Sequence, residues 1–193
     1  MNPPRNILVV LGGISGSGKT FLTSLLAEKS GFAVIPSLTT RRPRAGEGGS
    51  IDRHFCTLSQ FEQLQNENRI LCGRHFFGNW YGLDVTMVDA AAARGDAVVQ
   101  LTYKSVDKFR ARYPAAKTIY IEPSSLHLTR ETVKARRLAA DETVMRLQEI
   151  DDEIAFIKRD RNGASPLFDA YFLNERTAKS EAAFIAAIDS LRR

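Results

Sequence analysis

Ile7-Leu8-Val9-Val10-Leu11 is an apolar run of strand length, and Gly13-Ile14-Ser15-Gly16-Ser17-Gly18-Lys19-Thr20 follows it almost at once. The second segment fits the pattern G-x-x-x-x-G-K-[ST] and leads into a stretch of helical period that begins near Lys19. Glycines let the backbone curl so that its N–H groups point at phosphate oxygens, and the positive end of the helix dipole faces the same anion. The pattern predicts that Lys19 reaches the β- and γ-phosphates and that the Thr20 hydroxyl ligates Mg²⁺. The segment is therefore expected to bind a nucleoside triphosphate.

Strand-length apolar runs and stretches of helical period alternate along most of the chain. The expected strands cover residues 7–11, 32–35, 97–101, 118–121 and 169–173, and the expected helices cover residues 19–29, 84–94, 105–112, 125–138, 143–158 and 179–191. One apolar stripe, at three- and four-residue steps on the helix 143–158, is formed by Val144, Leu147, Ile150, Ile154 and Ile157. The alternation predicts an α/β fold whose parallel sheet is covered on both faces.

Residues 37–83 break this alternation. They contain a loop rich in proline, glycine and arginine, then a candidate capping box at Ser59-x-x-Glu62, and short strands that end at Gly78-Asn79. Asp84 follows as a candidate N-cap for the next helix, and Gly95 can close that helix. We interpret residues 37–83 as a small lobe of mixed strands inserted into the main core.

Length and composition bound the class of protein. With 193 residues the chain forms about one domain, and its 44% hydrophobic and 25% charged residues are typical of a globular protein. Cys56 and Cys72 are too few for a disulfide framework, so a reducing compartment is expected. Apolar runs are too short for a membrane span or a signal peptide, which makes the cytoplasm the expected location.

The charge balance of the chain is basic, with 27 Lys and Arg against 22 Asp and Glu. Most of the cations are arginines, which suit bidentate contact with phosphate, although composition alone is equally typical of arginines that coat a surface. We expect a small phosphate-bearing molecule as the partner, neither nucleic acid nor membrane, and a monomer or homodimer.

A GTPase or ATPase switch is the first alternative for such a loop. It normally needs an acidic Mg²⁺ ligand after a second strand and, for guanine, an N-K-x-D signature. Ala97-Val98-Val99-Gln100-Leu101-Thr102 ends without an acid, and N-K-x-D does not occur in the sequence. The pattern therefore argues against a switch protein.

Two further motifs follow the phosphate loop in order. Thr39-Thr40-Arg41-Arg42-Pro43-Arg44-Ala45-Gly46-Glu47 comes first, Gly78-Asn79-Trp80-Tyr81-Gly82 comes second, and Asn174-Glu175 follows the last expected strand. With these motifs the sequence resembles the guanylate kinase family over nearly its whole length. The resemblance implies a P-loop NTPase fold, namely a three-layer α/β structure with a parallel sheet, an acceptor-binding lobe and a helical lid. It also implies transfer of the γ-phosphate of ATP, with Mg²⁺, to a nucleoside monophosphate.

The resemblance also divides the chain into parts. The core is expected at residues 1–36, 84–131 and 151–193, the acceptor-binding lobe at 37–83, and the lid at about 132–150. Arg137 and Arg146 of the lid are expected to neutralise charge on the transferring phosphoryl group, together with Lys19 and Arg41. The expected contacts of ATP are Gly13, Ser15, Gly16, Ser17, Gly18, Lys19, Thr20 and Asn174.

The expected contacts of the acceptor lie in the lobe. Arg41, Arg44 and Tyr81 match family residues that hold the acceptor phosphate, and two guanidinium groups with a phenol can surround a dianion. Ser37 is a usual guanine contact that this sequence keeps. Arg53 stands where the family has a tyrosine that contacts the acceptor phosphate, and we expect it to assist in binding the acceptor.

The other guanine contacts of the family are missing. The glutamate that reads guanine falls at Cys72, the serine after Y-G falls at Leu83, and the aspartates that end the next strand fall among Leu101, Thr102 and Tyr103. An unmatched polar partner in a buried pocket is costly, so a pocket without these groups loses its selectivity. The sequence thus predicts phosphate transfer with weakened selection of guanine.

Three alternatives bear on this prediction. Ribose 1,5-bisphosphate phosphokinase also lacks the guanine-reading acids and has an apolar residue after Y-G, so a sugar-phosphate kinase is the second candidate. A non-catalytic binding module of the guanylate-kinase type is the third, and the intact phosphate loop argues against it. A zinc site at His54, Cys56, Cys72 and His75 is disfavoured because positions three apart on a strand face opposite sides unless a bulge intervenes.

Overall fold

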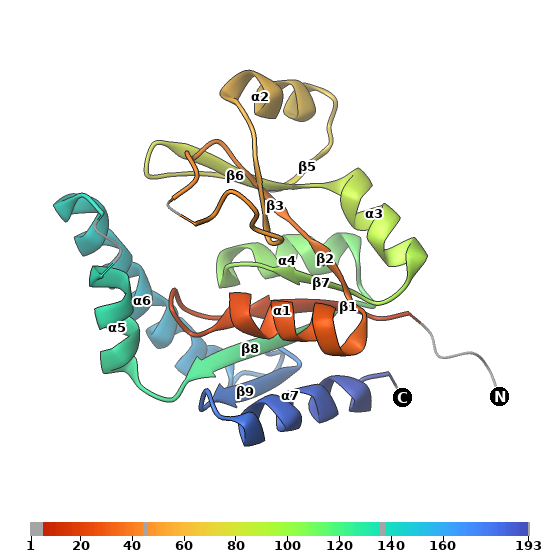
Figure 1. Cartoon of the computed structure of the whole chain (residues 1–193), viewed down its shortest axis with the longest axis vertical. Helices are drawn as coiled ribbons and strands as arrows, with labels where there is room; N and C mark the ends of the chain where they lie inside the picture. Colours follow the sequence, from red (N-terminus) through yellow and green to blue (C-terminus); the bar gives the residue numbers. More distant parts are fainter. Residues whose placement is uncertain (1–5, 45, 136–137, 193) are drawn as a thin grey trace.

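The computed structural model describes residues 6–44, 46–135 and 138–192. Its centre is a five-stranded parallel sheet with the order β2-β7-β1-β8-β9 (Figure 1). The strands are β1 (Leu8–Gly12), β2 (Ala33–Ile35), β7 (Ala97–Gln100), β8 (Lys117–Pro123) and β9 (Ala170–Asn174). Each corresponds to a predicted run, with ends that differ by one or two residues.

Helices cover both faces of this sheet because successive side chains of its strands point in opposite directions. Val9 and Leu11 of β1 belong to a buried cluster with residues of α1 (Lys19–Ser30) and α7 (Ala178–Ser190). Leu8 and Val10 belong to a second cluster with residues of α3 (Val85–Arg94), α4 (Tyr103–Arg112) and α6 (Ala140–Asp160). The predicted three-layer α/β core is confirmed.

A second, mixed sheet with the order β4-β3-β6-β5 is built from the inserted segment (Figure 1). β3 (Ser37–Thr39) pairs in parallel with β4 (Arg53–Phe55) and antiparallel with β6 (Asn79–Asp84), which also pairs antiparallel with β5 (Ile70–Phe76). Helix α2 (Leu58–Asn66) packs on this sheet through Phe61, whose ring stacks on that of Trp80 at 5.7 Å. The prediction of a small unit of mixed strands is confirmed.

The capping box of α2 lies two residues earlier than predicted. Thr57 is the N-cap: its side chain accepts a hydrogen bond from the backbone of Gln60, and the Gln60 side chain accepts one from the backbone of Thr57. The prediction of a capping box at Ser59-x-x-Glu62 was wrong. Thr57-x-x-Gln60 satisfies the same spacing rule, and glutamine serves as well as glutamate at the third helical position.

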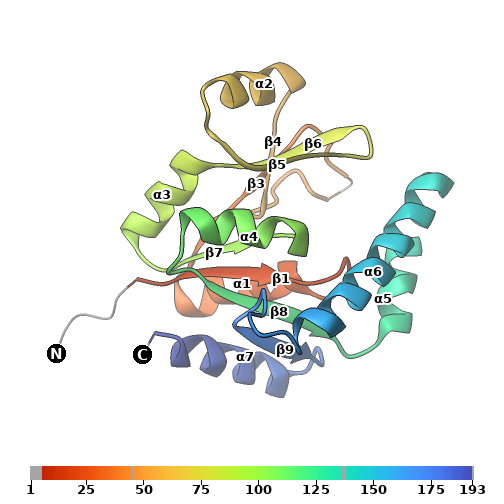
Figure 2. The same ribbon diagram turned by 180° about the vertical axis from the view of Figure 1, so that it is seen from behind.

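Two helices, α5 (Leu126–Lys134) and α6 (Ala140–Asp160), lie side by side at one end of the central sheet (Figures 1 and 2). Val133 and Ile150 bury their side chains against Ile14 of the phosphate loop, so these helices are attached to the loop through an apolar cluster. Val144 was predicted to belong to the buried stripe, but it is 65% exposed near the free end of α6. No helix within the described ranges is long and apolar enough to cross a membrane.

Candidate active site

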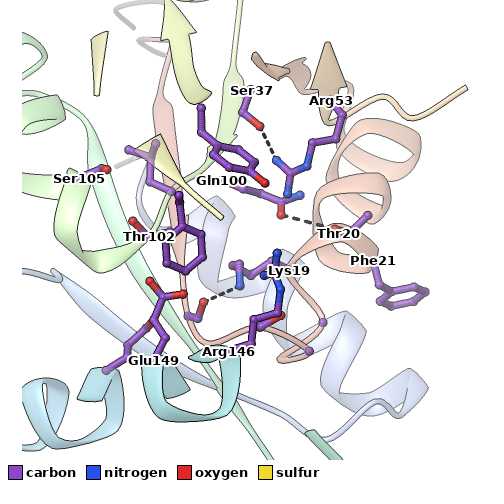
Figure 3. A pocket seen from close by; sticks show the side chains of 18 of the residues that line it. Lys19, Thr20, Phe21, Ser37, Arg53, Gln100, Thr102, Ser105, Arg146 and Glu149 are labelled. Carbon is purple, nitrogen blue, oxygen red and sulfur yellow. Dashed lines mark hydrogen bonds between the residues drawn. The ribbon is translucent and has the colours of Figure 1, made fainter. Parts of the chain in front are cut away.

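A cavity of about 680 Å³ lies between the phosphate loop, the second sheet and α6. In Figure 3, Lys19 lies next to Arg146 of α6, Arg53 of β4 lies on the side of Thr20, and Glu149 of α6 lies across the cavity from Thr20. Parallel sheets of this kind bind ligands outside the carboxyl ends of their strands, and the loop after β1 places the cavity there. The cavity therefore joins all three parts of the chain that the sequence predicted to act on substrates.

The phosphate loop has the backbone that its glycines predict. Gly13, Gly16 and Gly18 have φ angles of 140°, 87° and 94°, in a region that favours glycine. A Cβ atom at Gly18 would lie 2.3 Å from Nδ2 of Asn174, which donates a hydrogen bond to the Ser17 carbonyl at 2.9 Å. Asn174 thus fixes the back of the loop, and α1 begins directly after it at Lys19.

Lys19 lies folded over its own loop. Its ammonium group donates hydrogen bonds to the carbonyl oxygens of Gly13 and, at 2.9 Å, Ile14. Glu153 of α6 lies beside it, is only 5% exposed, and has a carboxylate oxygen, Oε1, with no hydrogen-bond partner in the described part of the chain. Burial raises the pKa of Glu153 to about 7, although the charge of Lys19 and a hydrogen bond with Tyr120 act in the opposite direction.

Glu153→Gln is expected to remove a pH dependence of stability. The folded pKa of about 7 lies above the ordinary value of 4.5, so the folded protein holds a proton that the unfolded chain releases between these two values. The contribution of Glu153 to the free energy of unfolding is therefore present below about pH 4.5 and is lost as the pH rises through 7. Relative to wild type, the variant should gain on the order of 3 kcal/mol between about pH 4.5 and pH 8.5.

Urea unfolding at several pH values measures this difference. Glu28→Gln, at an exposed position of α1, is the matched control and should show no such gain. If the difference in the free energy of unfolding between wild type and Glu153→Gln does not change with pH, the raised pKa assigned to Glu153 is contradicted.

Thr20 faces a carboxylate that the sequence analysis did not single out. Its hydroxyl donates to Asp52 Oδ2 at 3.1 Å, and the amide of Gln100 donates to the same oxygen at 3.0 Å. Asp52 is 5% exposed and comes from the loop before β4, whereas Thr20 begins α1. A carboxylate from the inserted segment thus lies beside the Thr20 hydroxyl although the end of β7 carries no acid, and only the tertiary structure reveals it.

Three arginines from two parts of the chain converge at the opposite wall. Arg41 contacts Glu47 at 2.8 Å, and Arg44 lies 3.8 Å from Glu47 and 4.0 Å from Glu142. Arg146 of α6 contacts Glu142 at 2.8 Å, which completes a chain of three cations and two carboxylates. Burial and the positive charges of Arg41 and Arg146 lower the pKa of Arg44, so the cluster holds more positive charge than its carboxylates neutralise.

Ser37, Arg53 and Tyr81 line the same cavity. The guanidinium of Arg53 donates to the Ser37 hydroxyl and, at 3.3 Å, to the Asp52 carbonyl, so Arg53 lies toward the Thr20 side of the cavity (Figure 3). Tyr81 stands on β6 opposite Arg74 of β5. The structure therefore brings all five predicted acceptor contacts to one cavity.

Cys72, Leu83 and Leu101, which stand at the positions where the sequence resemblance implies guanine contacts, line the far end of the cavity. Leu83 is 1% exposed and Leu101 is 8% exposed, and Cys72 turns its thiol to the Ser105 carbonyl at 3.3 Å. Burial raises the pKa of the Cys72 thiol to about 11. This wall holds no carboxylate at any of the replaced positions, although Glu149 and Glu153 face the cavity from α6.

The strand β5 is irregular at this wall. Its register with β6 shifts between Leu71 and Arg74, and Cys72 takes a left-handed φ of 57°. The bulge that a convergence of Cys72 and His75 requires is thus present, but the His75 ring packs on Trp80 at 5.1 Å instead. Among the described residues, no group of three or more His, Cys, Asp or Glu side chains is arranged to hold a metal by itself.

The predicted ATP contacts fall into two groups. Gly13, Ser15, Gly16, Gly18, Lys19, Thr20 and Asn174 line the cavity, whereas the side chain of Ser17 is fully buried behind the loop. Arg176 also lines the cavity and donates to the Gly16 carbonyl at 2.6 Å, a contact that the sequence analysis missed. Arg137, the second predicted lid arginine, lies outside the described residues.

Comparison with known proteins connects this geometry to one family. The model of the guanylate kinase family matches residues 5–177. A guanylate kinase of Neisseria gonorrhoeae is 31% identical over 188 residues, which cover 96% of this chain and 88% of the relative. One from Francisella tularensis subsp. holarctica is 32% identical over 158 residues, or 78% of this chain and 83% of the relative. The crystal structure of guanylate kinase from Anaplasma phagocytophilum shares the fold, with a TM-score of 0.69, 20% identity, and coverage of 98% and 88% of the two chains.

Proposed function

Because this chain belongs to the guanylate kinase family and is an ATP-dependent phosphotransferase, we propose that it transfers the γ-phosphate of ATP to a phosphate-bearing acceptor without strong preference for guanine. A nucleoside monophosphate is the first candidate for this acceptor. The observation that carries the proposal is the convergence of Arg41 and Arg44 of the inserted segment with Arg146 of α6 at one cavity wall.

ATP is bound by the phosphate loop in this proposal. Backbone N–H groups of the loop and the N-terminus of α1 surround the triphosphate, and Lys19 leaves the carbonyls of Gly13 and Ile14 to reach its terminal phosphates. Asn174 and Arg176, which also line the cavity, hold the loop backbone in place through the carbonyls of Ser17 and Gly16.

Mg²⁺ fits the donor set beside Thr20. A hydroxyl, the buried carboxylate of Asp52 and the side-chain oxygen of Gln100 lie together there, and hard oxygen donors are the ligands that Mg²⁺ takes. Mg²⁺ is usually held by one or two protein oxygens and the phosphates of the substrate, which suits a site with a single carboxylate. Bound here, the ion would neutralise charge on the phosphates, while Thr20 and Asp52 orient it.

The acceptor phosphate is held by Arg41, Arg44 and Tyr81, with Arg53 on the side of Thr20. Charge-assisted hydrogen bonds contribute about 1.5–3 kcal/mol each, so two guanidinium groups retain a dianionic phosphate without help from the base. Residues 37–83 then form the acceptor-binding lobe and residues 132–150 the lid, and the chain Arg41–Glu47–Arg44–Glu142–Arg146 joins the two.

Guanine is selected weakly because the side chains at the positions of the family's guanine contacts are either apolar or already hydrogen-bonded within the protein. Leu83 and Leu101 offer no hydrogen bond, and the thiol of Cys72 is bonded to Ser105. Each lost polar partner is worth about 1–3 kcal/mol, so two or three losses remove several orders of magnitude in selectivity. A ribose 1,5-bisphosphate type of acceptor is the second candidate, because Arg53 adds a cation where the family has a tyrosine.

A screen of acceptors with the purified protein, ATP and Mg²⁺ tests this function. GMP, AMP, CMP, UMP and ribose 1,5-bisphosphate are compared by kcat/KM, and no hundredfold preference for GMP is expected. Arg41→Ala and Arg44→Ala should each raise the KM of the best acceptor by about 10-fold or more, since each removes a charge-assisted contact.

Arg94→Ala, an exposed substitution at the end of α3, is the control for the two arginine variants and should leave the KM unchanged. GMP turnover at least about a hundredfold above all other acceptors would refute weak guanine selection. Unchanged KM values in both arginine variants would refute the assigned phosphate site.

A further inference from the structure

We propose that Arg74 determines acceptor specificity by binding a second anionic group at the end of the acceptor that lies away from the transferred phosphate. The inference rests on the proposed function and narrows its substrate class. Arg74 is not among the residues that the sequence patterns single out. It is the one lysine or arginine that lines the far wall of the main cavity beside Cys72, Leu83 and Leu101 in the described part of the chain.

The geometry holds the Arg74 guanidinium toward the cavity. Nη1 donates to the hydroxyl of Thr102 at 3.1 Å, and the guanidinium carbon lies 4.5 Å from the centre of the Phe76 ring and 6.0 Å from that of Tyr81. Because Arg74 pairs with Tyr81 across the β5–β6 ladder, the two side chains share one face of the sheet. Tyr81 belongs to the proposed phosphate site, so Arg74 is its neighbour on the distal side.

A second cavity of about 220 Å³ adjoins the first behind Arg74. The two cavities share Cys72, Arg74, Phe76, Ser105 and Glu149. The smaller one is also lined by Lys104 and Lys108, which are one turn apart on α4. The distal end of the acceptor site therefore opens toward three cations.

One carboxylate faces these cations. Glu149 Oε1 lies 3.8 Å from Arg74 Nη2 and 3.7 Å from Lys104 Nζ, both beyond ordinary hydrogen-bond length. The three cations are thus only partly neutralised, and Arg74 keeps donors that its bond to Thr102 does not use. The N-terminus of α4 lies at the same wall and adds to the positive potential.

The chemistry selects a class of acceptor. A neutral base that presents N–H donors to this wall meets another donor, whereas a phosphate or carboxylate accepts from Arg74 in bidentate fashion. The second anion can be a phosphate on a sugar or a carboxylate on a base. Either one places a negative charge where the guanine-reading acids of the family would repel it.

Binding measured by calorimetry in the presence of ADP and Mg²⁺ tests the inference with two matched pairs. Ribose 1,5-bisphosphate is compared with ribose 5-phosphate, and orotidine 5′-monophosphate is compared with UMP, which lacks only the carboxylate. At least one pair should show about 10-fold or tighter binding of the member with the second anion, and that pair identifies the source of the charge.

Substitutions assign the preference to Arg74. Arg74→Ala should abolish it while changing the binding of UMP and ribose 5-phosphate less than about threefold, and Arg74→Lys should restore part of it. Lys108→Ala, an exposed change on α4, should reduce the preference in a protein of unaltered melting temperature. Arg159→Ala is the matched control, because Arg159 is exposed on α6 and lines neither cavity.

Two results would overturn the inference: equal binding within both pairs, or an unchanged preference in Arg74→Ala. If both members of a pair lose affinity equally in that variant, Arg74 only braces α4 through Thr102. Phosphate transfer to no acceptor, with the binding preference present, would refute the proposed function and leave the inference standing. Phosphate transfer to acceptors that lack a second anion, together with no binding preference in either pair, would refute the inference and leave the proposed function standing.

Discussion

Lys19→Ala is expected to lower kcat for phosphate transfer by about 10³-fold, measured with the best acceptor of the screen. Lys19 is the cation that the phosphate loop provides for the β- and γ-phosphates, and removing one preorganised donor to developing charge costs about 10²–10³ in rate. Its ammonium group donates hydrogen bonds to the carbonyls of Gly13 and Ile14, so it already lies against the loop that is proposed to bind the phosphates. Calorimetry should also show weaker binding of ATP in Mg²⁺ buffer.

The control for this variant is Lys29→Ala, at the exposed last turn of the same helix. It should retain wild-type kcat and ATP affinity. A Lys19→Ala protein with more than about a tenth of wild-type kcat would contradict the role of the loop, provided that its melting temperature shows it to be folded.

Arg146→Ala is expected to lower kcat by about 10²–10³-fold with little change in the KM of the acceptor. An arginine that stabilises the charge of a transferring phosphoryl group is worth about 10³–10⁵, and neighbouring Arg44 compensates for part of the loss. The side chain is only 13% exposed, contacts Glu142 at 2.8 Å and lies 4.9 Å from the centre of the Phe77 ring. These contacts hold it at the cavity.

The split between kcat and KM separates this role from simple acceptor binding. Arg159→Ala, on the same helix and away from the cavity, should match wild type in both constants. A higher KM with unchanged kcat would instead place Arg146 with Arg41 and Arg44 among the groups that hold the acceptor in its ground state.

Sequence patterns predicted the parts of this molecule that depend on local order. The phosphate loop, the alternating strands and helices and the small mixed sheet all follow from spacing along the chain, because period and turn chemistry are local properties. The error at the N-terminus of α2 is also local, since Thr57 and Ser59 compete for the same role. The prediction for Val144 was wrong for another reason. An apolar stripe of helical period does not reveal that the first turns of α6 extend beyond the elements that bury the rest of the stripe.

The residues that sequence reasoning missed reach the site through distant pairings. Asp52 meets Thr20 because β4 pairs with β3, and Glu153 meets Lys19 because α6 folds back on the phosphate loop. Arg74 meets Thr102 across 28 positions of sequence. Cys72 stands where the family has a glutamate, and this loss of a negative charge two residues before Arg74 is a sequence signal that could have suggested a cation at the far wall. Only the structure shows that the Arg74 guanidinium lines the cavity.

The ring of Phe76 connects the β5–β6 hairpin with helix α6. It lies 4.5 Å from the guanidinium of Arg74, which belongs to the same strand, and 5.9 Å from that of Arg146, which belongs to α6. The β5–β6 hairpin, which we propose to bind the acceptor, is thereby in contact with α6, which carries Arg146. We therefore expect an acceptor that binds against the hairpin to restrain Arg146 through this ring, a restraint that a water molecule in place of the acceptor would not supply.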